Sequence, residues 1–174
     1  MQNVQHDVVI VGAGAGGVAV AASLLKRRAN LNIALIDPAK EHSYQPGWTL
    51  VGGGVFKQSQ TRRPMSSVIP NGVTHYSEAA NTFQPDENSV TLANGQVISY
   101  KALVVSPGLK LNWEAIPGLK ETLGKNGVTS NYQWETAPYT WQNVQQLKKG
   151  KAIFTQPPMP IKCAGAPQKA MYLS

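Results

Sequence analysis

The most specific chemical pattern in the sequence is the glycine-rich segment 12–17. Gly12, Gly14 and Gly17 have the spacing G-x-G-x-x-G. In this pattern the first glycine permits a tight turn, the second lets the backbone approach a pyrophosphate, and the third lets a helix pack closely on a strand. Asp37 follows 20 residues after Gly17, at the end of a predicted strand, where its carboxylate can accept hydrogen bonds from ribose hydroxyls. This context favours dinucleotide binding over a purely structural turn, and an acid at this position argues against a ribose 2′-phosphate.

The second candidate for chemistry is Cys163, the only cysteine of the chain. It lies beside Lys162 and just before a predicted helix that opens at Gly165, and a neighbouring cation and a helix N-terminus both enrich the reactive thiolate. A lone cysteine is by default a small buried residue, and from the residues alone that interpretation is favoured. A single cysteine excludes a disulfide or a dithiol reaction within this chain.

Other common catalytic arrangements are not expected. The histidines His6, His42 and His75 lack cysteine or carboxylate partners at ligand spacing, so no metal site is predicted. For His42, which lies near the predicted cofactor loop, a surface or hydrogen-bonding role is favoured. Ser23 and Ser106 have no G-x-S-x-G context, which argues against a serine hydrolase.

Composition indicates an ordinary globular chain. Of the 174 residues 42% are hydrophobic, and no apolar run reaches the length of a spanning helix. The net charge is +7, but the basic residues are scattered without interleaved aromatic residues, so a solvated basic surface is favoured over nucleic-acid binding. The segment before the first predicted strand is short and polar. We therefore expect no signal peptide and a cytoplasmic, bacterial setting, either free or on the cytoplasmic face of the inner membrane.

The elements that would position these residues follow from apolar periodicity. A strand, a helix and a second strand, which form a βαβ unit, are predicted at 7–11, 18–28 and 32–37. A long loop that carries functional residues, called the excursion below, is predicted at 40–72, with a short helix near 65–69. An antiparallel meander follows at 73–100, with a hairpin turn at Asn94-Gly95. Further elements are a strand at 102–105, a loop region at 110–137, a helix at 139–149, a strand at 151–155 and a helix opening at 165–167.

This order of elements resembles the two-dinucleotide-binding-domain flavoproteins. The resemblance implies an α/β fold: a Rossmann-like FAD/NAD(P)-binding domain with a parallel sheet and an inserted antiparallel β-meander, over residues 1–150. Residues 151–174 would be the opening strand and helix of a second dinucleotide-binding-like domain. In that family the strand after the meander ends in Ala-Thr-Gly, whereas here only the glycine of Ser106-Pro107-Gly108 is kept.

Two segments carry a sharper resemblance. Residues 41–54, with Tyr44-Gln45-Pro46, and residues 160–169, with Cys163, are similar to the sulfide:quinone oxidoreductases, especially the subgroup that includes the mitochondrial enzyme. The segments 63–70 and 130–132 also fit, and the resemblance spans essentially the whole chain. It implies FAD as the cofactor, sulfide and quinone as substrates, and peripheral membrane association through a C-terminal part that this sequence does not contain.

The resemblance also assigns roles to individual residues. Ala15 and Gly16 would contact the FAD diphosphate, and Asp37 would hold the adenosine ribose. Gln45 would reach the cofactor from the excursion, and Ala80 would meet the adenine through its backbone at the end of the first meander strand. The full set implied for FAD binding is Gly12, Gly14, Ala15, Gly16, Gly17, Asp37, Gln45, Ala80 and Gly108.

Cys163 would match the redox cysteine of that family. There, sulfide attacks a disulfide between two cysteines, one of which becomes a persulfide while the other, the match of Cys163, is released to react with the flavin. With the resemblance, the redox role is favoured over a buried structural thiol. Because the partner cysteine is absent, we expect this chain to be the N-terminal portion of such an enzyme and unable to complete turnover by itself.

Two alternatives stay open. One is an NADH:quinone-type flavin dehydrogenase, against which weighs the absence of a second G-x-G-x-x-G after the strand at 151–155. The other is a non-catalytic FAD- or dinucleotide-binding module. That alternative predicts that Cys163→Ser leaves the behaviour of the cofactor unchanged.

Overall fold

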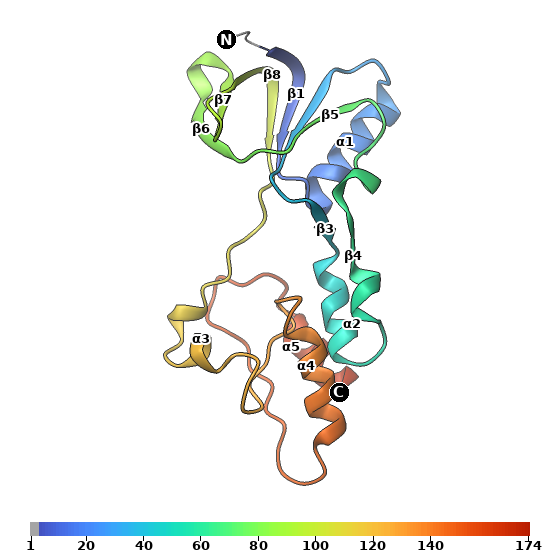
Figure 1. Ribbon diagram of the computed structural model, residues 1–174, viewed down its shortest axis with the longest axis vertical. Helices are drawn as coiled ribbons and strands as arrows, with labels where there is room; N and C mark the ends of the chain where they lie inside the picture. The colour runs from blue at the N-terminus through green and yellow to red at the C-terminus, as the bar shows by residue number, and fades with distance from the viewer. Residues whose placement is uncertain (1–3) are drawn as a thin grey trace. The chain divides into compact units, whose positions relative to one another are not determined.

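The apolar run near the N-terminus forms a central strand, β1 (Val4–Val11), of a six-stranded sheet in a computed structural model that describes residues 4–174. The strand order is β5-β2-β1-β8-β7-β6 (Figure 1). Strands β2, β5 and β8 run parallel to their neighbours in the central part of the sheet, and β6, β7 and β8 form an antiparallel meander at one side. The bounds are β2 (Ile33–Ile36), β5 (Val73–Tyr76), β6 (Ala80–Gln84), β7 (Ser89–Leu92) and β8 (Val97–Val105).

The chain divides into two compact units, which are described separately. Unit 1 contains the described residues up to Ser43 together with Arg63–Leu109, and unit 2 contains Tyr44–Arg62 and Lys110–Ser174. A two-stranded ribbon of β3 (Glu41–Ser43) and β4 (Arg62–Pro64) lies where the chain leaves unit 1 and returns to it. The two domains predicted from the sequence, 1–150 and 151–174, are not the same division of the chain as these two units. The predicted boundary at residue 150 stays a prediction.

The core of unit 1 lies on both faces of the parallel strands, which explains why their sequences are apolar without alternation. On one face Val9, Val11 and Ile36 pack with residues of the meander. On the other face Ile10 and Leu35 pack against helix α1 (Ala15–Arg27), which places Ala21 in this cluster. The helix ends in Lys26 and Arg27, cations that suit the negative end of its dipole.

The meander differs from the prediction in one strand. Residues 73–76 were expected to open the meander, but β5 pairs in parallel with β2, in the register Ile33↔Val73. Parallel neighbours need a long crossover, and the excursion between β2 and β5 supplies it. The strands predicted at 96–100 and 102–105 form one continuous strand, β8. The hairpin turn is confirmed: Gly95 has φ +84° and its N–H donates to the Leu92 carbonyl at 2.9 Å.

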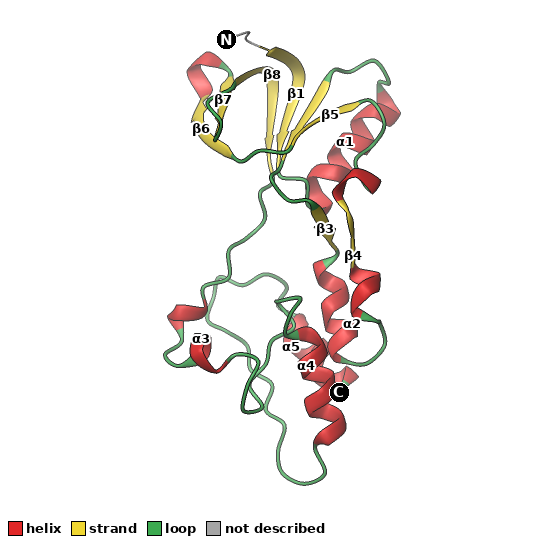
Figure 2. Ribbon diagram, in the orientation of Figure 1, coloured by secondary structure: helices red, strands yellow, loops and turns green. Residues whose placement is uncertain are grey.

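Unit 2 is built mainly from helices and loops (Figure 2). Its helices are α2 (Trp48–Gly52), α3 (Leu119–Thr122), α4 (Ala137–Gln146) and α5 (Ala166–Leu173), with short 3-10 helices at Gln45–Gly47, Gln58–Thr61 and Trp113–Ala115. The glycines that follow α2 allow close packing. A Cβ on Gly53 would lie 2.5 Å from Cβ of Leu173 in α5, and one on Gly54 would lie 2.5 Å from the Trp141 ring in α4. The glycine-rich excursion is therefore the surface on which α4 and α5 pack.

Three other expectations are settled in the described chain. The strand predicted at 151–155 is wrong: these residues form no ladder, and Ile153 is 81% exposed. A strand is stable only when a neighbouring strand satisfies its backbone N–H and C=O groups, and no strand of the described chain pairs with this segment. The short helix near 65–69 is a 3-10 helix at Met65–Ser67, and α5 begins at Ala166 with proline in its first turn, as predicted. Within residues 4–174 no helix has the length and apolar character needed to cross a bilayer.

Candidate functional site

The glycine-rich loop joins β1 to α1 in a conformation that requires glycine at two positions. Gly12 has φ +99°, and a Cβ there would lie 2.2 Å from the carbonyl oxygen of Ser106. A Cβ on Gly17 would lie 1.8 Å from the carbonyl oxygen of Gly12. The first glycine thus makes the turn and the third lets the helix approach the strand, as the spacing predicts.

The outer side of the loop is open. Gly14, Ala15 and Gly16 are exposed, and a Cβ added at Gly14 would meet no atom within 4 Å. Gly14 is the N-cap residue of α1, and no side chain caps the helix. The first turn of α1 contains no acidic residue. A helix N-terminus of this kind presents backbone N–H groups and the positive end of the helix dipole, which suits a diphosphate.

Asp37 fixes this loop and remains able to bind a further donor. Its Oδ2 accepts the N–H of Ala13 at 2.7 Å, and its Oδ1 accepts the N–H of Ala39 at 2.8 Å. Each carboxylate oxygen has two lone pairs, so both oxygens can still accept a hydroxyl. The residues of unit 1 therefore fit a dinucleotide with a free ribose diol at this position.

His42 holds the same loop from the other side, which is the hydrogen-bonding role expected for it. Its Nδ1 donates to the carbonyl oxygen of Ala13 at 3.0 Å, which fixes the proton on Nδ1. Ala13 is therefore held through its N–H by Asp37 and through its carbonyl by His42. No sequence pattern identified this contact, because it depends on how the chain between β2 and β3 turns back to the loop.

The other predicted residues of unit 1 lie at strand ends. Gly108 follows β8 with φ +79° and is exposed, and Ser106 connects β8 to the loop by donating its N–H to the Val11 carbonyl at 2.8 Å. Ala80 was expected to end the first meander strand, and this placement is wrong. It is half-buried and begins β6, because the preceding strand ends at Tyr76.

Cys163 and Gln45 belong to unit 2. Cys163 is exposed and occupies a turn before α5, with φ +65°. The N–H of Ala166, the first residue of α5, donates to the Cys163 carbonyl at 3.0 Å. Nζ of Lys162 donates to Oε1 of Gln45, so unit 2 brings the predicted cofactor residue Gln45 to the segment that carries the predicted redox cysteine.

Tyr132 completes this arrangement and was not identified as a functional residue from the sequence. Its hydroxyl donates to the carbonyl of Lys162 and lies 3.4 Å from the carbonyl oxygen of Cys163. Partial burial, and to a smaller degree the charge of a Cys163 thiolate, raises the pKa of the Tyr132 phenol. The phenol therefore keeps its proton and remains a donor at neutral pH.

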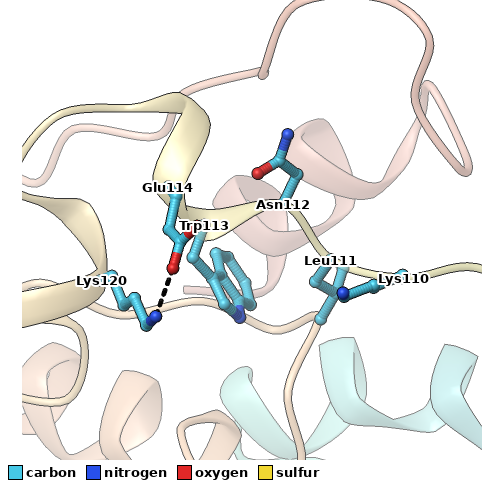
Figure 3. A pocket seen from close by; sticks show the side chains of 6 residues that line it. All are labelled: Lys110, Leu111, Asn112, Trp113, Glu114 and Lys120. Carbon is cyan, nitrogen blue, oxygen red and sulfur yellow. Dashed lines mark hydrogen bonds and ion pairs between the residues drawn. The ribbon is translucent and has the colours of Figure 1, made fainter.

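One open hollow lies elsewhere in unit 2 (Figure 3). Its volume is about 500 Å³, and Glu114 and Lys120 form an ion pair at its wall. The residues that line it are Lys110, Leu111, Asn112, Trp113, Glu114 and Lys120. None of the predicted cofactor or redox residues is among them, and the ion pair already neutralises one of its cations.

Comparison with known proteins identifies relatives over nearly the whole chain. Residues 6–144 match the family described as pyridine nucleotide-disulphide oxidoreductase. The mitochondrial sulfide:quinone oxidoreductase of Dictyostelium discoideum is 46% identical over 168 residues, which cover 95% of this chain and 37% of that protein. The mitochondrial sulfide:quinone oxidoreductase of Mus musculus is 42% identical over 169 residues, covering 97% of this chain and 38% of that protein.

A solved structure gives the same result. The sulfide:quinone oxidoreductase of Aquifex aeolicus superposes with a TM-score of 0.67 and 29% identity, over 82% of this chain and 32% of that one. These similarities confirm the predicted fold class and the resemblance to sulfide:quinone oxidoreductases. The chain spans less than two fifths of the length of these two mitochondrial relatives.

Proposed function

Because the chain belongs to the pyridine nucleotide-disulphide oxidoreductase family, we propose that it is the FAD-binding part of a sulfide:quinone oxidoreductase. The observation that carries this proposal is the identity of 46% and 42% to two proteins of that name, over at least 95% of this chain. The same relatives do not favour the NADH:quinone dehydrogenase or the non-catalytic module. The reaction belongs to the whole protein, with sulfide as electron donor and a quinone as acceptor.

Eight of the nine residues proposed to hold FAD belong to unit 1. In unit 1 the exposed backbone of Gly14, Ala15 and Gly16 would bind the diphosphate, and the Asp37 carboxylate would accept hydroxyls of the adenosine ribose. Gly12 and Gly17 give the loop its shape, while Ala80 and Gly108 would contribute backbone contacts at strand ends. In unit 2, Gln45 would reach the cofactor. When bound, FAD supplies the two-electron chemistry, and the protein binds and orients it.

Cys163 would supply the thiol that reacts with the cofactor. Its exposure and its position in the turn immediately before α5 support this role, because a thiol that reacts with a cofactor must be accessible. The partner cysteine would come from a part of the protein outside this sequence. The same holds for peripheral membrane association and for the rest of a second domain that would begin near residue 151. A cytoplasmic location, or the cytoplasmic face of the inner membrane, belongs to the same proposal.

The first experiment separates cofactor binding from redox chemistry. FAD is titrated into the purified chain and into the Asp37→Ala variant, with the visible flavin spectrum as readout. We expect the wild-type chain to acquire a flavin band and the variant to bind FAD about tenfold or more weakly, because a charge-assisted acceptor is lost. Equal FAD affinity in both chains would reject the proposed role of Asp37.

The second experiment uses the full-length protein and the variant Cys163→Ser. The variant should retain FAD but lose sulfide-driven bleaching of the flavin. Chemical reduction of the flavin by dithionite is the control, because it does not need the thiol. A Cys163→Ser protein that is bleached by sulfide at the wild-type rate would exclude the redox role and support the non-catalytic module.

A further inference from the structure

The turn that contains Cys163 has a backbone conformation that needs support. Cys163 has φ +65°, in the left-handed region, which residues other than glycine, asparagine and aspartate adopt rarely. Such a conformation persists only where surrounding contacts hold it. The hydrogen bond from the Ala166 N–H to the Cys163 carbonyl holds the side of the turn that faces α5.

The other side of the turn is held by residues distant in sequence. The Tyr132 hydroxyl donates to the carbonyl of Lys162, in the peptide group that immediately precedes Cys163. The Lys162 side chain in turn donates to Oε1 of Gln45. The peptide that precedes the cysteine and the side chain beside it therefore have separate partners, 30 and 117 residues away.

Tyr132 is itself firmly placed. It is half-buried, and its N–H donates to Oγ of Ser130 at 3.1 Å. The carbonyl of Ser130 accepts a hydrogen bond of 2.6 Å from Oγ1 of Thr136, which is buried next to α4. These two bonds hold the backbone that carries the half-buried Tyr132 ring, whereas the turn that its hydroxyl contacts is exposed.

We propose that Tyr132 is a positioning residue that holds the Lys162–Cys163 peptide in its left-handed turn and so gives the exposed thiol one orientation. This inference rests on the proposed function in one respect: the single orientation would serve to present the thiol for reaction with the cofactor. Its structural content, the bond from Tyr132 to the turn, can be measured without any reaction.

The test compares two tyrosine variants of the purified chain. Tyr132→Phe removes the hydroxyl and keeps the ring. Tyr139→Phe is the matched control, because the Tyr139 oxygen accepts the Gly127 N–H at 3.0 Å and that bond does not involve the turn. The readouts are the NMR shifts of the Lys162 carbonyl carbon, which reports the bond it accepts, and of the Cys163 Cα, which reports the backbone conformation.

In Tyr132→Phe we expect the Lys162 carbonyl shift to move and the Cys163 Cα shift to move toward extended values. The loss of one hydrogen bond should lower the population of the left-handed turn, relative to other conformations of this segment, by about 2- to 10-fold. Tyr139→Phe should leave both shifts in place. Unchanged shifts in Tyr132→Phe, or equal changes in both variants, would overturn the proposal.

A titration of the wild-type chain tests the same bond without a substitution. Ionisation of Tyr132 at alkaline pH, above the ordinary tyrosine value of 10.0, removes the hydroxyl proton. The Lys162 carbonyl shift should then follow the Tyr132 ring shifts. A Tyr132 ring that titrates while this carbonyl does not respond would also overturn the proposal.

The full-length protein separates this inference from the proposed function. We expect Tyr132→Phe to keep its FAD affinity and to lower the rate of flavin bleaching by sulfide about 2- to 10-fold, whereas Tyr139→Phe keeps the wild-type rate. Failure of sulfide to bleach the wild-type flavin would reject the proposed function, and the NMR comparison would still decide the role of Tyr132. Equal bleaching rates in the two variants would reject positioning, even with the function intact.

Discussion

Gly16 and Gly17, which are adjacent in the first turn of α1, should respond very differently to substitution by alanine. A Cβ on Gly17 would lie 1.8 Å from the Gly12 carbonyl oxygen and 3.2 Å from Cγ2 of Ile10. The Gly12 backbone cannot easily move away, because its N–H is bonded to the Ile36 carbonyl at 2.9 Å. Overpacking of a core typically costs about 1–3 kcal/mol, and a clash with a fixed backbone atom belongs at the upper end, about 3 kcal/mol.

The neighbouring residue is the control. A Cβ on Gly16 would lie 3.7 Å from Cβ of Ser106, an ordinary van der Waals contact. Gly16 is inside α1, where alanine is favoured over glycine by up to about 1 kcal/mol. Gly16→Ala should therefore be neutral or stabilising, and the two variants should differ in free energy of unfolding by about 3–4 kcal/mol.

Thermal unfolding of the cofactor-free chain, followed by far-ultraviolet circular dichroism, measures this difference. For a chain of this size each kcal/mol shifts Tm by about 2–4 °C, so Gly17→Ala should lower Tm by roughly 6–12 °C. All four tryptophans lie in unit 2, so their fluorescence reports unfolding of that unit separately. A Gly17→Ala chain with the Tm of Gly16→Ala would refute the assignment of Gly17 as the contact between helix and strand.

Two further predictions concern polar contacts of β1. His6 is 4% exposed, and its ring nitrogens lie 2.7 Å from Oδ1 of Asn32 and 3.0 Å from the Tyr76 hydroxyl. His6→Leu should reduce the free energy of unfolding in urea by about 1–3 kcal/mol, because both partners lose their bond, and adding Tyr76→Phe should recover part of that loss. The pKa of Asp7 is lowered, first by its bond to Lys101 and then by the Asn32 N–H. This stabilisation is present above the unfolded value of 3.8 and is lost as pH falls through the lowered folded pKa, so Asp7→Asn should weaken the acid sensitivity of the urea midpoint below that value.

The parts of the fold that the sequence predicts well are those in which local pattern and local geometry agree. The apolar run of β1, the glycine spacing and the carboxylate of Asp37 each act within one βαβ unit, whose handedness and connections are strongly constrained. The hairpin at Gly95 was equally predictable, because few residues adopt its positive φ.

The errors concern the pairing of strands. A short apolar segment such as Val73–Tyr76 is correctly predicted to be a strand, but its sequence does not specify whether its neighbour is parallel or antiparallel. The partner was decided by the excursion, which returns the chain beside β2. Residues 151–155 have the composition of a strand and no strand partner in the described chain, so Ile153 stays in solvent and Phe154 is only partly buried. Local propensity predicts the ability to form a strand, and the partner decides whether one forms.

The same distinction applies within the candidate site. The backbone features, glycines that need positive φ or close contact, were visible in the sequence because they restrict residue type. The side-chain contacts were not: the bond from Lys162 to Gln45 joins residues 117 apart, and that from Tyr132 to Lys162 joins residues 30 apart. Nothing in the type of a tyrosine or a glutamine reveals such a partner. The loop that would bind FAD is therefore specified mainly by backbone shape, whereas the cysteine turn is specified by long-range hydrogen bonds. Conservative substitutions such as Tyr132→Phe should consequently affect thiol presentation far more than cofactor binding.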